Sequence, residues 1–340
     1  MTQKERKVKK IIYGIPGTII PYFMLSAILL NQCKLDKSFE IDLVNTPDKV
    51  EIFADEYVST NLYERDIAIS PKGDEIIYTL SDYKQSKQCL VRIRKIGSAW
   101  GRKEILGFSG QYSDLEPCFS ANGNELYFAS DRPTEINSER GDYNIWVSAR
   151  INEDWSEPKP LPSAINSEKD EFFPSIAGNG NLYFTSAREN GIGSEDILIS
   201  RFIDGEYTNP EPLDSNINTP AYEFNAYITP EEDLLIFSSY GRKDDMGGGD
   251  LYYSRKDKYG NWTAAVNMGP QINSDKLDYC PFIDMSRGNF YFTSERILSI
   301  DKKIENVSEL EGLANHILNG MGNIYRIHLD SVRISKITAN

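Results

Sequence analysis

The sequence predicts an all-β fold, a β-propeller of five four-stranded blades with a short helical insertion in the last blade. The first observation is a sequence motif that recurs along the chain: an acid opens a short strand, a turn follows, and an apolar strand ends the motif. Its copies open at Glu64, Asp114, Glu171, Glu223 and Asp278. The second is its spacing, because a supersecondary unit repeated about every 50 residues is typical of propellers and related arrays. The third is the content of 20 Tyr and 15 Phe, residue types that favour strands.

The N-terminal segment, residues 1–32, is expected to be a signal peptide or a membrane anchor. Basic residues dominate positions 1–10, and an almost wholly apolar run follows over positions 11–30. This order is that of a secretory signal, and the apolar run is also just long enough to span a bilayer. Both interpretations predict export or attachment to a membrane.

Cys33 follows this segment directly, in the run Leu29-Leu30-Asn31-Gln32-Cys33. The run resembles the lipobox of bacterial lipoproteins, where the Cys becomes the lipidated first residue, although Gln32 departs from the small residue expected there. The resemblance implies lipidation at Cys33, and the alternative is an ordinary signal peptide with an incidental Cys. Residues 33–49 are then expected to form a polar tether, and residues 50–340 the propeller.

A short alternating strand, Val50–Ala54, precedes the first full repeat. Its distance to the opening acid Glu64 matches that of the last strand of a repeat to the next acid. We therefore expect it to pair into the final blade and close the ring, which removes an open sheet edge. Six blades are the alternative if residues 34–63 build more than one strand.

Each full repeat is expected to give four strands. The first follows the opening acid, and a tight turn comes next, with Gly supplying a positive φ in every repeat except the fourth. The second strand is apolar on both faces, as in Phe290-Tyr-Phe-Thr293, which indicates a central strand sandwiched between neighbouring blades.

Residues 297–320 interrupt the last repeat with apolar residues near helical spacing. Ser308 and Glu311 have the spacing of a capping box, and Gly320 is a suitable stop. The segment is therefore predicted to be a helix inserted between two strands of the fifth blade.

The repeats resemble the WD-like repeat of TolB-type β-propellers, in which a strand, a Pro/Asn-x-Gly turn and a Tyr-Phe-x-Ser-x-Arg strand recur. The resemblance covers roughly residues 50–336. It implies a propeller of the bacterial cell envelope, periplasmic or associated with the outer membrane. It is specific for the fold and says less about function, because such propellers serve as binding platforms, parts of peptidases and envelope components.

Two sets of charged residues recur with this motif, one set of acids and one of arginines, and both are interpreted as structural. A residue type required in every blade is more simply a requirement of the blade than a site, and pairing of Arg with a carboxylate is strong and directional. The acids of this set are Glu64, Asp114, Glu171, Glu223 and Asp278, and the arginines are Arg132, Arg188, Arg242 and Arg296.

The binding surface is expected where the blades differ, just after each opening acid. If the first strands line the channel, these positions lie near one mouth and combine a charge with aromatic rings, a composition that suits a peptide or a sugar. The candidate binding residues are Arg65, Phe172, Phe224 and Tyr279. The alternative is that the aromatic rings only pack between blades.

Composition excludes several classes of function. The formal net charge of −14 argues against nucleic acid as a partner, since its recognition needs clustered Lys and Arg. With His316 and His328 as the only histidines, the sequence predicts no metal site, no cofactor and no Ser-His-Asp triad.

The sequence thus predicts a monomeric, non-catalytic binding or scaffolding propeller, held at a membrane through its N-terminus. Its expected ligand is an envelope protein, a peptide or a glycan. The alternative is a carbohydrate-active hydrolase, which would need carboxylates that break the repeat pattern. Glu116 and Asp170 are the off-pattern candidates.

Overall fold

The computed structural model of the protein describes residues 40–134, 141–332 and 334. The expected leader (1–32) and Cys33 lie outside these residues, as do positions 34–39 of the expected tether. Within the described part, no helix has both the length and the apolar character needed to cross a membrane.

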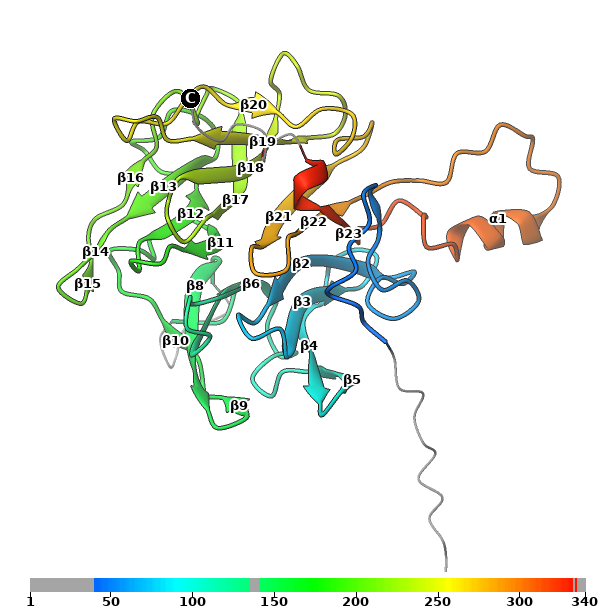
Figure 1. Cartoon of the computed structure of the whole chain (residues 1–340), viewed down its shortest axis with the longest axis horizontal. Coiled ribbons are helices and arrows are strands. Elements are labelled where there is room, and N and C mark those ends of the chain that lie inside the picture. Colours follow the sequence, from blue (N-terminus) through cyan, green and yellow to red (C-terminus); the bar gives the residue numbers. More distant parts are fainter. Residues whose placement is uncertain (1–39, 135–140, 333, 335–340) are drawn as a thin grey trace, which may run out of the picture. The chain divides into compact units, whose positions relative to one another are not determined.

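Five antiparallel sheets follow one another along the chain, and the first strands of neighbouring sheets contact each other in a closed ring (Figure 1). Blade one contains β2 (Tyr63–Ile69), β3 (Glu75–Ser81), β4 (Gln88–Ile96) and β5 (Ala99–Ile105). Blade two contains β6 (Asp114–Phe119), β7 (Glu125–Ser130), β8 (Asn144–Ile151) and β10 (Lys159–Pro160). Blade three contains β11 (Glu171–Ile176), β12 (Leu182–Ser186), β13 (Asp196–Ser200) and β16 (Glu211–Pro212). Blade four contains β17 (Tyr222–Ile228), β18 (Leu234–Tyr240), β19 (Asp250–Arg255) and β20 (Val266–Asn267). Blade five contains β21 (Asp278–Asp284), β22 (Asn289–Ser294), β23 (Asn323–His328) and β1 (Glu51–Ile52). The prediction of five four-stranded blades is confirmed.

Three further short strands lie outside the four-stranded order: one pairs with a blade strand, and the other two form a two-stranded sheet of their own. They are β9 (Asp154–Trp155), which pairs with β8, and the hairpin of β14 (Phe202–Ile203) and β15 (Glu206–Tyr207).

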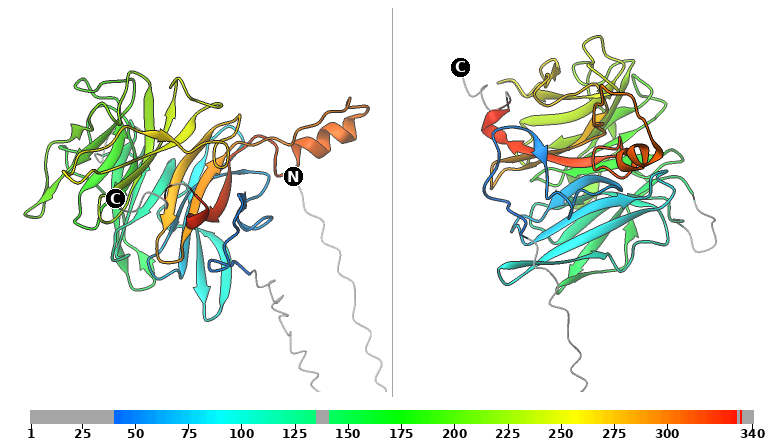
Figure 2. Two further views of the ribbon diagram at one scale, coloured as in Figure 1. Left: turned by 45° about the horizontal axis from the view of Figure 1, so that its top comes forward. Right: turned by 90° about the vertical axis from the view of Figure 1, so that its right-hand side faces the viewer.

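The ring is closed by the N-terminal strand, as the sequence predicted. β1 pairs antiparallel with β23, with Glu51 opposite Arg326 and Ile52 opposite Tyr325. The last blade therefore takes three strands from the C-terminal part of the chain and its outermost strand from the start. Both views of Figure 2 show this blade beside the first one.

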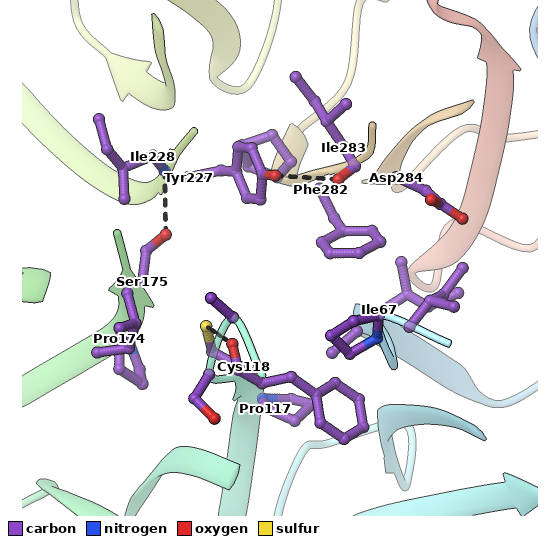
Figure 3. A pocket seen from close by; sticks show the side chains of 18 of the residues that line it. Ile67, Pro117, Cys118, Pro174, Ser175, Tyr227, Ile228, Phe282, Ile283 and Asp284 are labelled. Atoms are coloured by element: carbon purple, nitrogen blue, oxygen red, sulfur yellow. Dashed lines mark hydrogen bonds between the residues drawn. The ribbon is translucent and has the colours of Figure 1, made fainter. Parts of the chain in front are cut away.

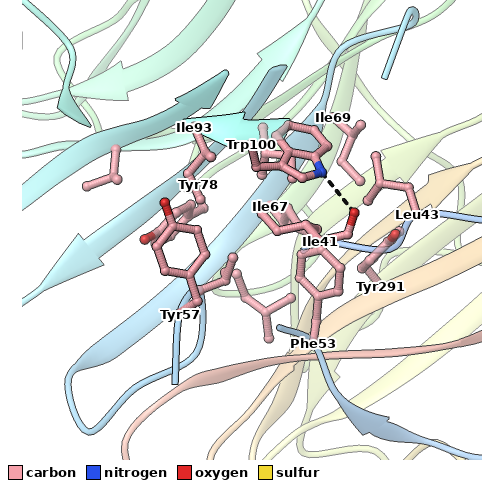
Figure 4. Close-up of a cluster of buried hydrophobic side chains, with 14 residues drawn as sticks. Ile41, Leu43, Phe53, Tyr57, Ile67, Ile69, Tyr78, Ile93, Trp100 and Tyr291 are labelled. Carbon is pink, nitrogen blue, oxygen red and sulfur yellow. Dashed lines mark hydrogen bonds between the residues drawn. The ribbon is translucent and has the colours of Figure 1, made fainter. Parts of the chain in front are cut away.

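The chain ahead of β1 also belongs to the folded unit. Ile41 and Leu43 are buried in a cluster that includes residues of blades one and five, and Trp100 Nε1 donates to the Ile41 carbonyl at 2.8 Å (Figure 4). The Leu43 carbonyl accepts from Asn289 Nδ2 at 2.7 Å. The C-terminal part of the expected tether, residues 33–49, is therefore packed against the propeller from Ile41 onward.

The second strands separate the cores between blades. In β22, Tyr291 packs in the cluster shared with blade one, whereas Phe290 and Phe292 pack in the cluster shared with blade four. In β18, Leu235 and Phe237 belong to one cluster and the alternating residues of the same strand to the next. A strand that is apolar on both faces is therefore required by its position between two blades.

The insertion in blade five contains one short helix, α1 (Val307–Ala314), none of whose residues is buried. Its N-cap is Asn306, whose side chain accepts from the backbone N–H of Glu309 at 3.0 Å. The C-cap is Asn315. The predicted Ser308–Glu311 capping box is therefore wrong, because both residues lie inside the helix, although the position of the helical insertion is confirmed.

Candidate functional site

Every innermost strand carries a β-bulge at the same place, two residues after the opening acid. The pairing register shifts there in all five blades. Each bulge residue has a positive φ, which a non-glycine residue adopts at a cost of about 1 kcal/mol. These residues, here called the bulge ring, are Asp66, Glu116, Phe173, Asn225 and Cys280.

Threonine hydroxyls anchor three of these bulges. The backbone N–H of Asp66, Glu116 and Asn225 donates to Thr293, Thr79 and Thr185 respectively, each in the second strand of the preceding blade. In blade two the equivalent residue is Ala129, which has no hydroxyl. The N–H of Phe173 donates instead to Glu116 Oε2 at 2.7 Å. Glu116 therefore replaces a missing threonine as the acceptor of a buried backbone donor.

All five blades meet in one buried polar cluster built around Glu116. Arg65 Nη2 donates to Glu116 Oε1 at 2.7 Å, and its Nε lies 2.7 Å from Asp66 Oδ2. Asn225 Nδ2 donates to the same Glu116 oxygen at 3.2 Å, and the Cys280 thiol donates to Asn225 Oδ1 at 3.5 Å. This central cluster lies across the middle of the ring of innermost strands.

Burial dominates the electrostatics of the central cluster. It raises the pKa of Glu116 from its ordinary value to about 7, although the neighbouring Arg65 charge acts in the opposite direction. Burial likewise raises the pKa of the Cys280 thiol, and the Asp66 charge adds to this effect. The cluster therefore contains a carboxyl group that titrates near neutral pH and a thiol that stays protonated there.

A cavity of about 240 Å³ lies on one side of the bulge ring, lined by the later residues of all five innermost strands. Figure 3 shows Ile67, Pro117, Pro174, Tyr227 and Phe282 around this opening, here called the channel pocket. Asp66 and Glu116 of the bulge ring are also among the lining residues. The pocket thus has largely apolar walls and carboxyl groups at its inner end.

Polar groups on the pocket wall are mostly engaged within the protein. Tyr227 OH donates to the Ile283 carbonyl at 2.9 Å, and Ser175 Oγ accepts from the Ile228 N–H at 3.0 Å (Figure 3). Asp284 pairs with Arg287 at 2.7 Å. A ligand would therefore find few free hydrogen-bonding groups along the wall.

The four candidate binding residues lie on the other side of the bulge ring. Phe172, Phe224 and Tyr279 belong to an apolar cluster that also contains Met321. Tyr279 is buried, its hydroxyl donates to Tyr63 OH at 3.0 Å, and Arg65 lies 5.1 Å from the centre of its ring. Phe172 and Phe224 are only partly buried. Arg65 is also only partly buried, so three of the four residues remain partly accessible, and the role of all four in binding stays a prediction.

The recurring arginines contact the acids of their own repeats. The Arg–carboxylate distances are 2.5 Å for Arg132–Asp114, 3.1 Å for Arg188–Glu171, 2.9 Å for Arg242–Glu223 and 3.3 Å for Arg296–Asp278. Glu64, whose repeat lacks the arginine, accepts from Thr60 N and Oγ1. All five acids are fully buried. These contacts support a framework role.

Sequence reasoning singled out Glu116 but not the other bulge residues Asp66, Phe173, Asn225 and Cys280. The sequence does carry one signal, since Asp and Asn adopt a positive φ more readily than other residues. Asp170, the other off-pattern acid, lies away from the central cluster and accepts from the Tyr143 N–H at 2.8 Å. Among the described residues, no group of three or more His, Cys, Asp or Glu side chains is placed to hold a metal ion.

No family model matches this chain, and no curated protein is similar to it in sequence. Among solved structures, the chain is similar to the putative TolB from Agrobacterium tumefaciens, with 16% identity and a TM-score of 0.43 over 68% of this chain and 69% of that one. It is also similar to TolB from Acinetobacter baumannii, with 11% identity and a TM-score of 0.42 over 77% of this chain and 53% of that one. A third similar structure is the catalytic domain of the GH62 α-L-arabinofuranosidase of Coprinopsis cinerea, with 13% identity and a TM-score of 0.43 over 86% and 97%. Such likenesses concern the fold alone, so function has to be argued from the site.

Proposed function

We propose that this protein is a non-catalytic binding propeller of the bacterial cell envelope, exported by its N-terminal segment and anchored by a lipid on Cys33. The channel pocket is its binding site, and the ligand is a peptide segment of another envelope protein. The observation that carries this proposal is the apolar cavity at the centre of five blades. Concave, mostly apolar sites with few polar groups are the usual form of a ligand site.

A peptide suits this pocket better than a glycan. Sugar hydroxyl groups need hydrogen-bond partners when they leave water, and burial without them is costly. The wall groups of Ser175 and Tyr227 already have partners within the protein. An apolar side chain of a peptide, in contrast, is stabilised by burial against Phe282 and the prolines of the wall, because this removes apolar surface from water.

A peptide-binding screen on the full chain tests the proposal. We expect binding that weakens about tenfold or more in Phe282→Ala, since this ring forms part of the wall. The matched control is Phe202→Ala, which removes a ring that is 41% exposed on the outer hairpin. Equal affinity of the two variants, or binding of glycans instead of peptides, would contradict the assignment.

The lipid anchor has a separate test. Mass spectrometry of the mature N-terminus should show processing at Cys33 with acyl chains attached, and the protein should partition with membranes. Stable anchoring needs more than a single acyl chain. An unmodified N-terminus beyond Cys33 would remove the anchor from the proposal and leave the pocket unaffected.

The second candidate function is a carbohydrate-active hydrolase, favoured by one observation. Glu116 and Asp66 form a carboxyl pair at the inner end of the pocket, and the pKa of Glu116 is raised to about 7, as in a general acid. Both groups, however, are already engaged by Arg65. Hydrolysis of aryl glycosides that is lost in Glu116→Gln would establish this alternative over the first.

A further inference from the structure

Every charged residue in the lining of the channel pocket is an acid. Asp66, Glu116 and Asp284 contribute to the lining, and no Lys, Arg or His of the described residues does. Arg287 pairs with Asp284, which balances that charge. At the inner end, Asp66 and Glu116 share the single guanidinium of Arg65. When both carboxyl groups are ionised, which for Glu116 requires a pH above about 7, the inner end of the pocket carries one negative charge that Arg65 does not balance.

Asp66 is also short of hydrogen-bond donors. Its side chain is 1% exposed. By strict geometry neither of its carboxylate oxygens accepts a hydrogen bond from a residue that the structure describes, and the one donor near it besides Arg65 is the Cys280 thiol, a weak donor. Arg65 Nε approaches Oδ2 to 2.7 Å as an ion pair only. Buried polar atoms are almost always satisfied, so the unused acceptors at this position point to a donor supplied by a ligand.

We propose that the channel pocket recognises an organic ammonium group on an apolar stem, with the ammonium beside Asp66 and Glu116. This inference rests on the proposed function, because it assigns the chemistry of the ligand to the same pocket. A cavity of about 240 Å³ is larger than the cavity of about 150 Å³ that holds benzene in another protein, so one ring or a branched chain fits. A free arylalkylamine and a lysine side chain both have this chemistry.

The ammonium is favoured over other head groups for a physical reason. It donates three hydrogen bonds and carries the charge that the inner end lacks. The wall rings of Tyr227 and Phe282 are suitable faces for a cation, and such contacts contribute more where water is excluded. A neutral hydroxyl would satisfy one acceptor and leave the charge imbalance, and a carboxylate would be repelled by two acids.

Calorimetric titration of the full chain with matched small probes tests the inference. The probes are 2-phenylethylamine, its neutral isostere 2-phenylethanol, and 3-phenylpropionate, which carries a carboxylate on the same stem. We expect the amine to bind at least about tenfold more tightly than the alcohol, and the carboxylate not to bind. Asp66→Asn should remove most of this preference while the affinity for the alcohol changes less than about twofold.

A second pair of probes distinguishes the sources of the ammonium. A short peptide with a central lysine is compared with the same peptide carrying norleucine, which has the same stem without the charge. A preference for lysine identifies a peptide as the source, and a preference confined to 2-phenylethylamine identifies a free amine. Equal or tighter binding of the neutral partner in both pairs would overturn the inference and leave the proposed pocket standing. Failure of all probes and of the peptide screen would overturn the proposed function itself.

Discussion

The backbone N–H of Phe173 donates to Glu116 Oε2 at 2.7 Å, in the place that a threonine hydroxyl occupies at three other bulges. Ala129 stands at the position equivalent to those threonines and has no hydroxyl, and a carboxylate from the same blade supplies the acceptor. The same carboxylate also accepts from Arg65 and Asn225. The presence of alanine at one position of a second strand is thus linked to the buried charge at the centre of the molecule.

This relationship predicts a measurable coupling. Glu116→Ala should lower the free energy of unfolding by about 1–3 kcal/mol, because the Phe173 N–H and Arg65 lose a buried partner. Adding Ala129→Thr should recover part of this loss by restoring the hydroxyl. A coupling of about 0.5 kcal/mol or more in a double-mutant cycle, measured by urea denaturation, supports the account. Strictly additive effects would contradict it.

The raised pKa of Glu116 predicts a dependence of stability on pH. Its folded-state pKa of about 7 lies above the ordinary value of 4.5, so the folded protein binds this proton more tightly than the unfolded chain. The contribution to stability is therefore complete below about pH 4.5 and is lost as the pH rises through about 7. Arg65 opposes the shift and Asp66 adds to it.

Denaturation at pH 5 and pH 8 measures this effect, with Glu116→Gln as the reference that cannot titrate. The fall in unfolding free energy between the two pH values should be larger in the unmodified protein by about 1 kcal/mol or more. Other buried carboxyl groups titrate in both proteins and cancel in the comparison. The same fall in both would show that Glu116 ionises normally.

The framework role of the recurring arginines predicts a loss of stability on truncation. Arg188→Ala leaves the fully buried Glu171 carboxylate without its cation, so the melting temperature should fall and the unfolding free energy should drop by about 1–3 kcal/mol. The matched control is Arg201→Ala, whose ion pair with Glu211 is largely exposed and contributes less than about 1 kcal/mol. Unchanged stability with lost ligand binding in Arg188→Ala would reverse the assignment of framework and site.

The packed segment ahead of β1 provides a test on neighbouring residues. Leu43 is 5% exposed and Val44 is 74% exposed. Leu43→Ala should cost about 2–5 kcal/mol of unfolding free energy, as in other buried positions, and Val44→Ala less than about 0.5 kcal/mol. Thermal unfolding of both variants decides whether this segment is part of the propeller. Similar melting temperatures would show that residues 40–49 act only as a tether.

Much of the architecture could be predicted because it repeats. The opening acid, the turn and the two-faced second strand occur in every blade, so each copy supports the others. The closing strand was predicted by its distance to Glu64, and β1 pairs as expected. The segment at Ile41 and Leu43 carried a weak signal, since the two apolar residues alternate with Asp42, but two residues alone do not distinguish a strand from a tether.

The site could be predicted only in part, because it is formed by residues that differ from one blade to the next. The bulge position holds Asp, Glu, Phe, Asn and Cys, so no common residue type marks it in the sequence. Its chemistry arises where Arg65, Glu116 and Asn225, far apart in the chain, converge on one point. Such a cluster depends on ring closure, which places the first strands of all five blades around a common centre.

Cysteine protection measures occupation of the channel pocket most directly. Cys118 lines the pocket and is partly exposed, whereas Cys89 is partly exposed but does not line it. Burial raises the pKa of Cys118 to about 11, so its alkylation is slow and is followed over a long incubation at about pH 8, where an amine ligand keeps its ammonium charge, with the modified peptides resolved by mass spectrometry. A saturating concentration of 2-phenylethylamine or of the lysine peptide should slow alkylation of Cys118 several-fold and leave the rate at Cys89 unchanged. An unchanged rate at Cys118 under conditions that saturate binding would place the ligand elsewhere and contradict the account.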